Sequence, residues 1–457
     1  MYHVGDLLAQ LRLDPEETEK QLILRDLLPI GKILIQGGPC RVWISVSGKP
    51  DDFTEVTDSG CDRMASVLRI EGTAPALVRF YVGEGWWAEA DRKYTTAFHR
   101  KNGWTGGDGI NSFNLQDGND AYGAETDSTM FIFGDTLVGK VDTDTDERIQ
   151  PVYMPNNTYA IMGSTLENLH FVVPEDEQGK PEAVLTPSPD VSDPGDWFWL
   201  QDGVVVGQTL YLSPLVMKMD ETKPEGFQFK IGGIAMAAVP LSGGQPHFDA
   251  ARQYKTKLYA RKDGFQYVGG IAYMPYTVQT GWKDGDGYIY VYGYRSPLEI
   301  YRNCQLIAGR VRPEDFEKES CWRWYDGEGW NGTDITQAVP LLDHVSCEMS
   351  VMPIRAGRQK GKFLAVFQHD VQSSYVAYAV GDSPAGPFEQ AKMVWLCDED
   401  RRIDPSVYMY NAKAHSHLSE PDSILVSYNV NTPSMETNER FATIYRPRFI
   451  RLHSTSV

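Results

Sequence analysis

The chain has 457 residues, of which 43 are basic and 62 acidic, so its formal net charge is −19. This negative charge argues against nucleic acid or an anionic membrane as the main partner, because binding phosphate groups requires a basic face. Hydrophobic residues make up 42% and charged residues 23%, which is typical of a globular protein with a large core. The 42 glycines, 27 prolines and 12% aromatic residues favour an all-β chain with many turns.

The cysteines and the N-terminus bear on the cellular compartment. None of the six cysteines forms a C-x-x-C pair, and no histidine pair stands beside them at zinc-ligand spacing, so we expect free thiols and no metal site. The first 20 residues lack an apolar segment of signal-peptide length, and no window approaches ~18 consecutive apolar residues. We therefore expect a cytoplasmic protein without a membrane span, or a secreted one if a leader is missing from this sequence.

Residues 1–91 are expected to form an N-terminal accessory module of short helices followed by β-strands. Within residues 5–27, Leu7, Leu8 and Leu11 would share one face of a helix. Alternating apolar stretches indicate strands at residues 32–36, 41–46, 67–70 and 77–82. Because this segment carries no recognisable chemical motif, we expect it to serve in packing or homo-oligomer formation rather than in sugar binding.

Residues 92–457 are expected to form one catalytic domain built from repeats. From about Trp104 a unit recurs, in which a strand with small residues is followed by a turn and a strand rich in Tyr, Phe and Val. Four antiparallel strands with long loops fill a repeat of about 70 residues. The sequence therefore predicts an all-β fold, a five-bladed β-propeller. The five copies align on Asp108, Asp202, Gly270, Glu348 and His415.

The aligned position is acidic in three of the five repeats. A propeller places the first strand of every blade around one axis, so side chains at one height converge. Strand interiors disfavour Asp, and burying carboxylates costs desolvation free energy. We therefore interpret Asp108, Asp202 and Glu348 as members of a functional cluster.

Asp108 and Asp135 are the first candidates for catalysis. Asp108 stands in a GGDG segment and Asp135 in an FGDT segment, 27 positions apart. This spacing fits an antiparallel hairpin with a long connection, which would place both carboxylates at the same end of one blade. Glycosidic cleavage requires two carboxyl groups, one to protonate the leaving oxygen and one to act as base or nucleophile. The alternative is that both are turn residues whose carboxylates accept hydrogen bonds from nearby backbone amides.

Asp202 and Glu348 are the second pair of candidates. Asp202 follows three aromatic residues, which would raise its pKa and make it an acid or a hydroxyl-binding group; a hairpin turn at Asp-Gly is the alternative. Glu348 lies within an apolar stretch, where a carboxylate without a partner is rare. It would act as an acid or adjust the pKa of the Asp pair, or it would simply pair with a buried arginine.

Aromatic and polar residues near these positions are expected to bind substrate. Tryptophans offer stacking faces for sugar rings, and alternation places the polar residues of 411–417 on one face of a strand. A lone histidine such as His415 is more often a structural residue, which remains the alternative. The predicted substrate-binding residues are Trp104, Trp197, Trp199, Trp282, Arg295, Gln368, His369, Asn411, Lys413, His415 and Asn429.

Several strings resemble a known family. GWTGGDGINSFNL, MFIFGDTLVG, WFWLQDGVVV and YNAKAHSHLSEPDSILVSYNVN are similar to bacterial propeller domains long labelled as of unknown function, some of which act as endo-D-arabinofuranases. The resemblance covers residues 104–451 and extends to the wider five-bladed group of arabinanases, invertases and levansucrases. It implies that Asp108 and Asp135 match the paired acids, and that Asp202 and Glu348 match inner-strand positions.

The sequence thus predicts a glycoside hydrolase that acts on arabinofuranosyl- or fructofuranosyl-type oligosaccharides or polysaccharides. A cytoplasmic glycoside phosphorylase and a non-catalytic carbohydrate-binding propeller are the alternatives. We expect carbohydrate to be the partner, with neither nucleic acid nor membrane. No cofactor is expected to be required, although a structural or central-cavity Ca²⁺ would be compatible with the fold.

Overall fold

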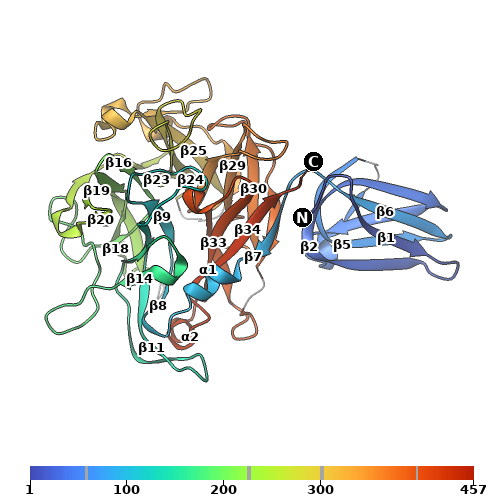
Figure 1. Ribbon diagram of the computed structural model, residues 1–457, viewed down its shortest axis with the longest axis horizontal. Helices are drawn as coiled ribbons and strands as arrows, with labels where there is room; N and C mark the ends of the chain where they lie inside the picture. The colour runs from blue at the N-terminus through green and yellow to red at the C-terminus, as the bar shows by residue number, and fades with distance from the viewer. Residues whose placement is uncertain (57–59, 224–227, 299–302, 398–399, 457) are drawn as a thin grey trace.

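The computed structural model describes residues 1–56, 60–223, 228–298, 303–397 and 400–456 (Figure 1). The fold is all-β, and within the described residues only two short α-helices occur, α1 (Arg92–Ala97) and α2 (Met435–Arg440). Each α-helix begins at a side-chain cap: Asp91 accepts a hydrogen bond from the amide of Tyr94, and Ser434 accepts one from the amide of Thr437. Among these residues, no helix has the length and apolar character needed to cross a membrane.

The N-terminal residues form a six-stranded antiparallel sheet in the order β1-β6-β2-β5-β3-β4. Figure 1 shows this sheet, in blue, beside the rest of the molecule and close to both termini. Its strands are β1 (Leu7–Leu13), β2 (Glu19–Gly37), β3 (Cys40–Ser45), β4 (Thr54–Val56), β5 (Gly60–Gly72) and β6 (Ala76–Val82).

The predicted helices within residues 5–27 are wrong, because this segment is extended. In β1 the side chains of Ala9, Leu11 and Leu13 are buried while the residues between them are exposed, which is the two-residue period of a strand. Leu7, which the helical interpretation placed on a buried face, is 55% exposed. Leucine spacing alone fits both periods over so short a segment.

The next part of the chain forms two neighbouring antiparallel sheets, in the orders β9-β10-β13-β14 and β8-β11-β12. The strands of the first are β9 (Asn111–Asn114), β10 (Thr129–Phe133), β13 (Thr158–Met162) and β14 (Leu169–Val172). Those of the second are β8 (Asn102–Gly107), β11 (Thr136–Val141) and β12 (Arg148–Tyr153).

Two larger antiparallel sheets follow. One has the order β15-β18-β19-β17-β16, with β20 and β21 also paired to β19, and the other has the order β22-β23-β24-β25-β26, with β27 paired to β25. The strands of the former are β15 (Trp197–Trp199), β16 (Gly203–Val206), β17 (Thr209–Leu212), β18 (Leu215–Met219), β19 (Phe229–Ser242), β20 (Gln245–Pro246) and β21 (Arg252–Lys255). Those of the latter are β22 (Tyr259–Lys262), β23 (Phe265–Tyr276), β24 (Tyr288–Pro297), β25 (Cys304–Val311), β26 (Arg323–Trp324) and β27 (Leu342–Val345).

The last two sheets have four strands each, in the orders β28-β29-β30-β31 and β32-β33-β34-β7. Their strands are β28 (Met349–Pro353), β29 (Phe363–Gln368), β30 (Tyr375–Gly381), β31 (Lys392–Leu396), β32 (Tyr408–Ala414), β33 (Ser423–Asn431), β34 (Pro447–Ser454) and β7 (Trp86–Ala90). Strand β7 comes from near residue 90 and pairs with β34 from the C-terminus, so the two ends of this part of the chain share one sheet (Figure 1).

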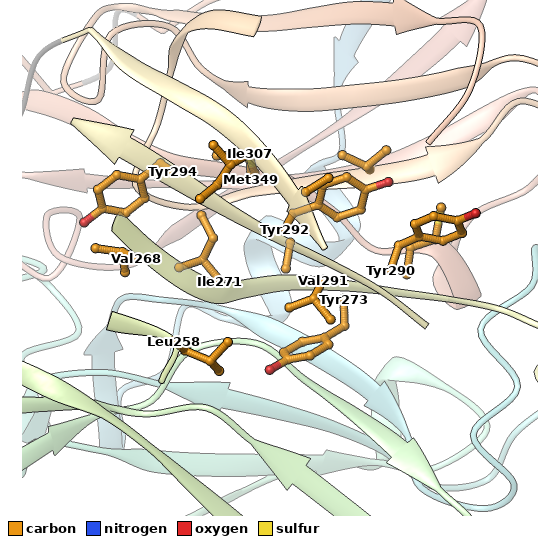
Figure 2. Packing of buried hydrophobic residues seen from close by; sticks show 14 of the residues in the cluster. Leu258, Val268, Ile271, Tyr273, Tyr290, Val291, Tyr292, Tyr294, Ile307 and Met349 are labelled. Atoms are coloured by element: carbon orange, nitrogen blue, oxygen red, sulfur yellow. The ribbon is translucent and has the colours of Figure 1, made fainter. Parts of the chain in front are cut away.

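Buried side chains fill the space between these sheets. The largest cluster contains residues of β16 to β30, and Figure 2 shows part of it, in which the rings of Tyr290, Tyr292 and Tyr294 lie among aliphatic side chains. Burying each such ring contributes about 1.5–3 kcal/mol. Gly293 lies between Tyr292 and Tyr294 in β24. An added Cβ on it would lie 2.3 Å from the carbonyl oxygen of Val268, so the close contact of β23 and β24 requires glycine at this position.

One cavity is bordered by strands from five different sheets. Its lining includes residues of β9, β16, β23, β28 and β32, which are spread over about 300 positions of the sequence. These sheets therefore border a common cavity, and the predicted site residues Asp202, Lys413 and His415 line it.

Candidate functional site

Asp108 lies just before β9, and its carboxylate is held by two tyrosines. Tyr410 Oη donates a hydrogen bond to Asp108 Oδ2 at 2.7 Å, and Tyr445 Oη donates to the same oxygen at 3.3 Å. An added Cβ on Gly134 would lie 2.6 Å from Asp108 Oδ1, so the FGDT segment needs glycine for the carboxylate to approach. Gly109, at φ +61°, supplies the left-handed turn after it.

Asp135 lies between β10 and β11 and is held by two other donors. Asn156 Nδ2 and Trp199 Nε1 donate to Asp135 Oδ1 at 3.1 and 3.0 Å. Trp199 belongs to β15 of the next sheet, three residues before Asp202. The pairing therefore joins the FGDT segment of one sheet to the aromatic segment of its neighbour.

Glu348 forms an ion pair with Lys413, which lies in β32. The lysine side chain is only 2% exposed and the glutamate 15%. The ion pair that was expected as the alternative role of Glu348 is present, with lysine in place of arginine. An added Cβ on Gly109 would lie 3.7 Å from Glu348 Oε1, so this pair lies close to the Asp108 turn.

Asp202 lies immediately before β16 and borders the cavity. Its Oδ2 accepts a hydrogen bond of 2.7 Å from the amide of Tyr273 in β23. The residues after Asp202 pair with β17, and its carbonyl oxygen accepts a hydrogen bond from Ser213 Oγ at 3.1 Å, while its carboxylate is fixed by the neighbouring sheet.

The pKa values of three carboxyl groups are raised by their surroundings. Burial, and then the nearby charge of Asp135, raise the pKa of Asp108 to about 7, although the hydrogen bond from Tyr410 opposes this. Burial raises the pKa of Asp135 to about 6 against its bonds from Asn156 and Trp199. Burial also raises the pKa of Asp202 to about 7. Asp108 and Asp135 therefore ionise near neutral pH, and the charge of Asp135 affects the ionisation of Asp108.

The cavity that Asp202 lines is polar. Its volume is about 60 Å³, which leaves room for a few ordered waters. Asp120 lines it, accepts hydrogen bonds from Ser416 Oγ at 3.0 and 3.1 Å, and has a pKa raised to about 8 by burial. Carboxylate oxygens of this kind are ligands that Ca²⁺ prefers, so a cavity ion remains a prediction.

His415 lines the cavity, yet both of its ring nitrogens have protein partners. Nδ1 lies 2.8 Å from Ser112 Oγ, and Nε2 lies 2.9 Å from Ser427 Oγ. Burial, and then the charge of Lys413, hold its pKa well below the usual value, so the imidazole is neutral. His415 follows directly after β32, and its ring nitrogens contact Ser112 of β9 and Ser427 of β33, as in the structural alternative; a role in substrate binding stays a prediction.

Two of the predicted stacking tryptophans are core residues. Trp104 is 1% exposed and packs against Phe133 and Phe171, while Trp282 is 2% exposed and packs against Tyr122. Neither has a free face for a sugar, so these two predictions are wrong. A tryptophan beside an acidic motif carries no signal that separates a core ring from an exposed one.

The other substrate-binding candidates divide by position. Arg295 donates to Gln305 and covers the ring of Phe265, and Gln368 is fully buried and donates to the carbonyl oxygen of Ser373. Neither Arg295 nor Gln368 lines the cavity.

Three of the remaining candidates lie on strands that contact the segments of Asp108 or Asp135, and the fourth, His369, does not. Asn429 Nδ2 donates to the carbonyl oxygen of Gly107 and so holds the turn that carries Asp108. Asn411 is buried at φ +60° between Tyr410 and Lys413. Trp197, like Trp199, lies in β15 and is partly exposed, whereas His369 lies apart, beside His344 and Asp370.

Sequence reasoning missed the groups that hold the two aspartates. Tyr410 and Tyr445 contact Asp108, and Asn156 contacts Asp135, although they lie 302, 337 and 21 positions away. Tyr410 directly precedes residues 411–417, which were proposed from the sequence for substrate binding. Its spacing of two from Tyr408 indicates that both tyrosines lie on one face of a strand. Tyr445 and Asn156 carry no local signal.

Comparison with known proteins identifies the family. Residues 91–454 match the family described as "Domain of unknown function (DUF5005)", and the chain belongs to this family. No curated protein matches the chain.

The fold is shared with a solved protein. A candidate hydrolase from Bacteroides ovatus is similar at a TM-score of 0.58 and 19% identity, over 80% of this chain and 90% of that one. Two further solved structures are less similar. Levansucrase from B. subtilis has a TM-score of 0.42 at 12% identity, over 80% of this chain and 88% of that one. A family 117 glycoside hydrolase from Zobellia galactanivorans has a TM-score of 0.39 at 10% identity, over 81% of this chain and 90% of that one. The first likeness shows a common fold at an identity too low to transfer an activity.

Proposed function

We propose that this protein is a glycoside hydrolase in which Asp108 and Asp135 cleave the bond between two sugars. The observation that carries the proposal is the close approach of two aspartate segments: an added Cβ on Gly134, the residue before Asp135, would lie 2.6 Å from Asp108 Oδ1. Burial raises the pKa values of Asp108 and Asp135 to about 7 and about 6. Two carboxyl groups that exchange one proton near neutral pH supply both the acid and the base that glycosidic cleavage requires.

The surroundings of the two aspartates support a division of roles between them. Asp135 accepts two hydrogen bonds on Oδ1, which stabilise the carboxylate and favour it as the base or nucleophile. Burial, and then the charges of Asp135 and Glu348, oppose the ionisation of Asp108 and raise its pKa to about 7, which favours Asp108 as the group that retains the proton. Asp108 would protonate the leaving oxygen while Asp135 acts on the anomeric carbon, directly or through a water.

The remaining charged groups tune this pair. The buried Lys413–Glu348 pair is close enough for its charges to act on both Asp108 and Asp202. Asp202, fixed by the amide of Tyr273, would accept a hydrogen bond from a sugar hydroxyl. The half-buried rings of Trp197 and Trp199 would border the sugar, since Trp199 already contacts Asp135.

We propose a furanosidic substrate, of arabinofuranosyl or fructofuranosyl type, on the strength of the GGDG and FGDT segments. In architectural terms, the cavity bordered by β9, β16, β23, β28 and β32 supports a five-bladed propeller over residues 92–457. Residues 1–91 would then be an accessory module, of which β7 completes the last blade.

A phosphorylase is disfavoured by the same contacts. Binding phosphate would require free basic groups beside the acid, but Lys413 is paired with Glu348 and His415 with two serines. Turnover that depends on inorganic phosphate would reverse this conclusion.

The proposal is tested by incubating the protein with D-arabinofuranosyl, L-arabinofuranosyl and fructofuranosyl oligosaccharides and with matched pyranosides. We expect reducing sugar to be released from one furanoside class, with the product's anomeric configuration followed by NMR. Binding of a furanoside without any product would favour the carbohydrate-binding alternative.

A further inference from the structure

A second group of chemically active side chains lies away from the carboxylate pair. His344 belongs to β27, and His369 and Asp370 follow directly after β29. Within the described part of the chain, these three are the one set of three or more His, Cys, Asp or Glu residues whose ligand atoms all lie within 4.8 Å of one another. Neither the family match nor the proposed hydrolysis gives this group a role.

The three side chains are arranged around the carboxylate of Asp370. His344 Nδ1 lies 2.8 Å from Asp370 Oδ1, and His369 Nδ1 lies 3.5 Å from Asp370 Oδ2. The two imidazole rings stack almost in parallel, 5.3 Å apart and inclined by 15°. Both histidines therefore direct the same ring nitrogen toward one carboxylate.

These spacings suit a zinc ion. Zinc bound by imidazole nitrogen and carboxylate oxygen at ~2.0–2.2 Å in tetrahedral geometry separates neighbouring ligand atoms by about 3.3 Å. The observed 2.8 and 3.5 Å fall on either side of that value. Two imidazoles and one carboxylate are a donor set for zinc or a similar divalent transition metal, whereas Ca²⁺ and Mg²⁺ prefer oxygen ligands alone.

The backbone holds the two loops together independently of any ion. The amide of Asp370 donates to the carbonyl oxygen of His344 at 3.0 Å, and the amide of His369 donates to the carbonyl oxygen of Tyr375 at 3.0 Å. The side chains remain reachable from solvent, since His344 is 48% exposed, Asp370 34% and His369 22%. The site is therefore preformed and open to an ion from solution.

We propose that His344, His369 and Asp370 form a divalent transition-metal site, with zinc as the metal that fits it best. Three protein ligands leave at least one position for water or for an oxygen of a bound molecule. The ion would join the segment leading into β28, which carries Glu348 four residues after His344, to the end of β29. It would thus stiffen the outer border of the proposed active site without touching Asp108 or Asp135.

Isothermal titration of the metal-free full-length protein with ZnCl₂ tests this site. We expect one zinc per chain with a Kd in the micromolar range or below, and a zinc-dependent rise in the melting temperature. His344→Ala, His369→Ala and Asp370→Asn should each weaken binding at least about tenfold, because three ligands are needed. His99→Ala is the matched control, since it removes a histidine paired with one carboxylate, Asp146, outside this group; its zinc affinity should equal that of the wild type.

Circular dichroism of each variant separates loss of the ligand from loss of the fold. A folded His369→Ala protein that binds zinc as tightly as the wild type would overturn the proposal. Wild-type protein that takes up no zinc at millimolar concentration would overturn it as well. The titration involves no sugar, so its outcome is independent of the proposed hydrolase activity.

Discussion

At the scale of single residues, the two aspartates differ in what surrounds each carboxylate. Asp135 accepts hydrogen bonds from an amide and an indole, and Asp108 accepts them from two tyrosine hydroxyls. The like charge beside Asp108 raises its pKa further, whereas burial alone raises that of Asp135. The order of the two pKa values therefore follows from contacts and from charge.

The pH profile of kcat/KM should be bell-shaped. Asp135 must be deprotonated, so activity should rise as the pH passes through about 6; Asp108 must be protonated, so activity should fall as the pH passes through about 7. The two limbs belong to the coupled pair as macroscopic values. Initial rates between pH 4 and 9 measure them, and a rate that still increases between pH 8 and 9 would rule out Asp108 as the acid.

Tyr410→Phe should shift the alkaline limb to higher pH. The hydroxyl of Tyr410 donates to Asp108 at 2.7 Å and lowers its pKa, so its removal leaves the proton more firmly bound. We expect a loss of kcat of about tenfold with little change in KM, because the tyrosine positions the acid rather than the sugar. Tyr408→Phe on the same strand is the control; an unshifted limb in Tyr410→Phe would contradict this role.

At the scale of elements, short turns between strands place the carboxylates. Gly134 lets the strand β10 end directly against Asp108, and Gly109 lies between Asp108 and Glu348. The GGDG and FGDT segments were visible in the sequence because glycine beside aspartate is a local pattern. The groups that hold these segments in place come from other sheets and could not be read locally.

Gly134→Ala should reduce activity without unfolding the protein. The added Cβ would lie 2.6 Å from Asp108 Oδ1, so the carboxylate must move, and misplacing a catalytic group by about 1 Å costs about 10²-fold in rate. Gly233→Ala is the matched control, since nothing lies within 4 Å of its added Cβ. Equal kcat values in these two variants, with equal melting temperatures, would show that the turn does not position Asp108.

The sequence predicted strands better than helices. It located the short motifs, but it did not predict which side chains are buried and which are accessible. The leucines of residues 7–11 fit a helix as well as a strand, and only the pairing of β1 with β6 decides between them. The rings of Trp104 and Trp199 look alike in the sequence, yet one is in the core and the other donates to Asp135. The burial of Trp104 depends on Phe133 and Phe171, which lie tens of positions away and are not part of the local pattern.

At the scale of the whole molecule, the last sheet joins distant parts of the chain. Strand β7 pairs with β34 over Trp86–Ala90, and the amide of Thr455 donates to the carbonyl oxygen of Gly85 at 2.9 Å. The sequence did not predict the pairing of β7 with β34, because the two strands lie some 360 positions apart. The same strand connects the six-stranded N-terminal sheet to the rest of the protein.

Removing β7 should destabilise the protein more than removing the N-terminal sheet does. A chain beginning at residue 92 would leave the edge of β34 unpaired, whereas a chain beginning at residue 84 would keep the pairing. We expect the melting temperature of the shorter chain to be at least roughly 5 °C lower than that of the longer one. Calorimetry of both chains measures the difference, and equal melting temperatures would show that β7 does not stabilise the sheet.

The central claim is that Asp108 and Asp135 together break a glycosidic bond. The most direct test compares turnover of the furanoside that the wild type hydrolyses with turnover by Asp108→Asn and by Asp135→Asn, each checked for an unchanged fold by circular dichroism. We predict that kcat falls by about 10²- to 10⁴-fold in each variant while both remain folded. Wild-type turnover in either folded variant would contradict the account.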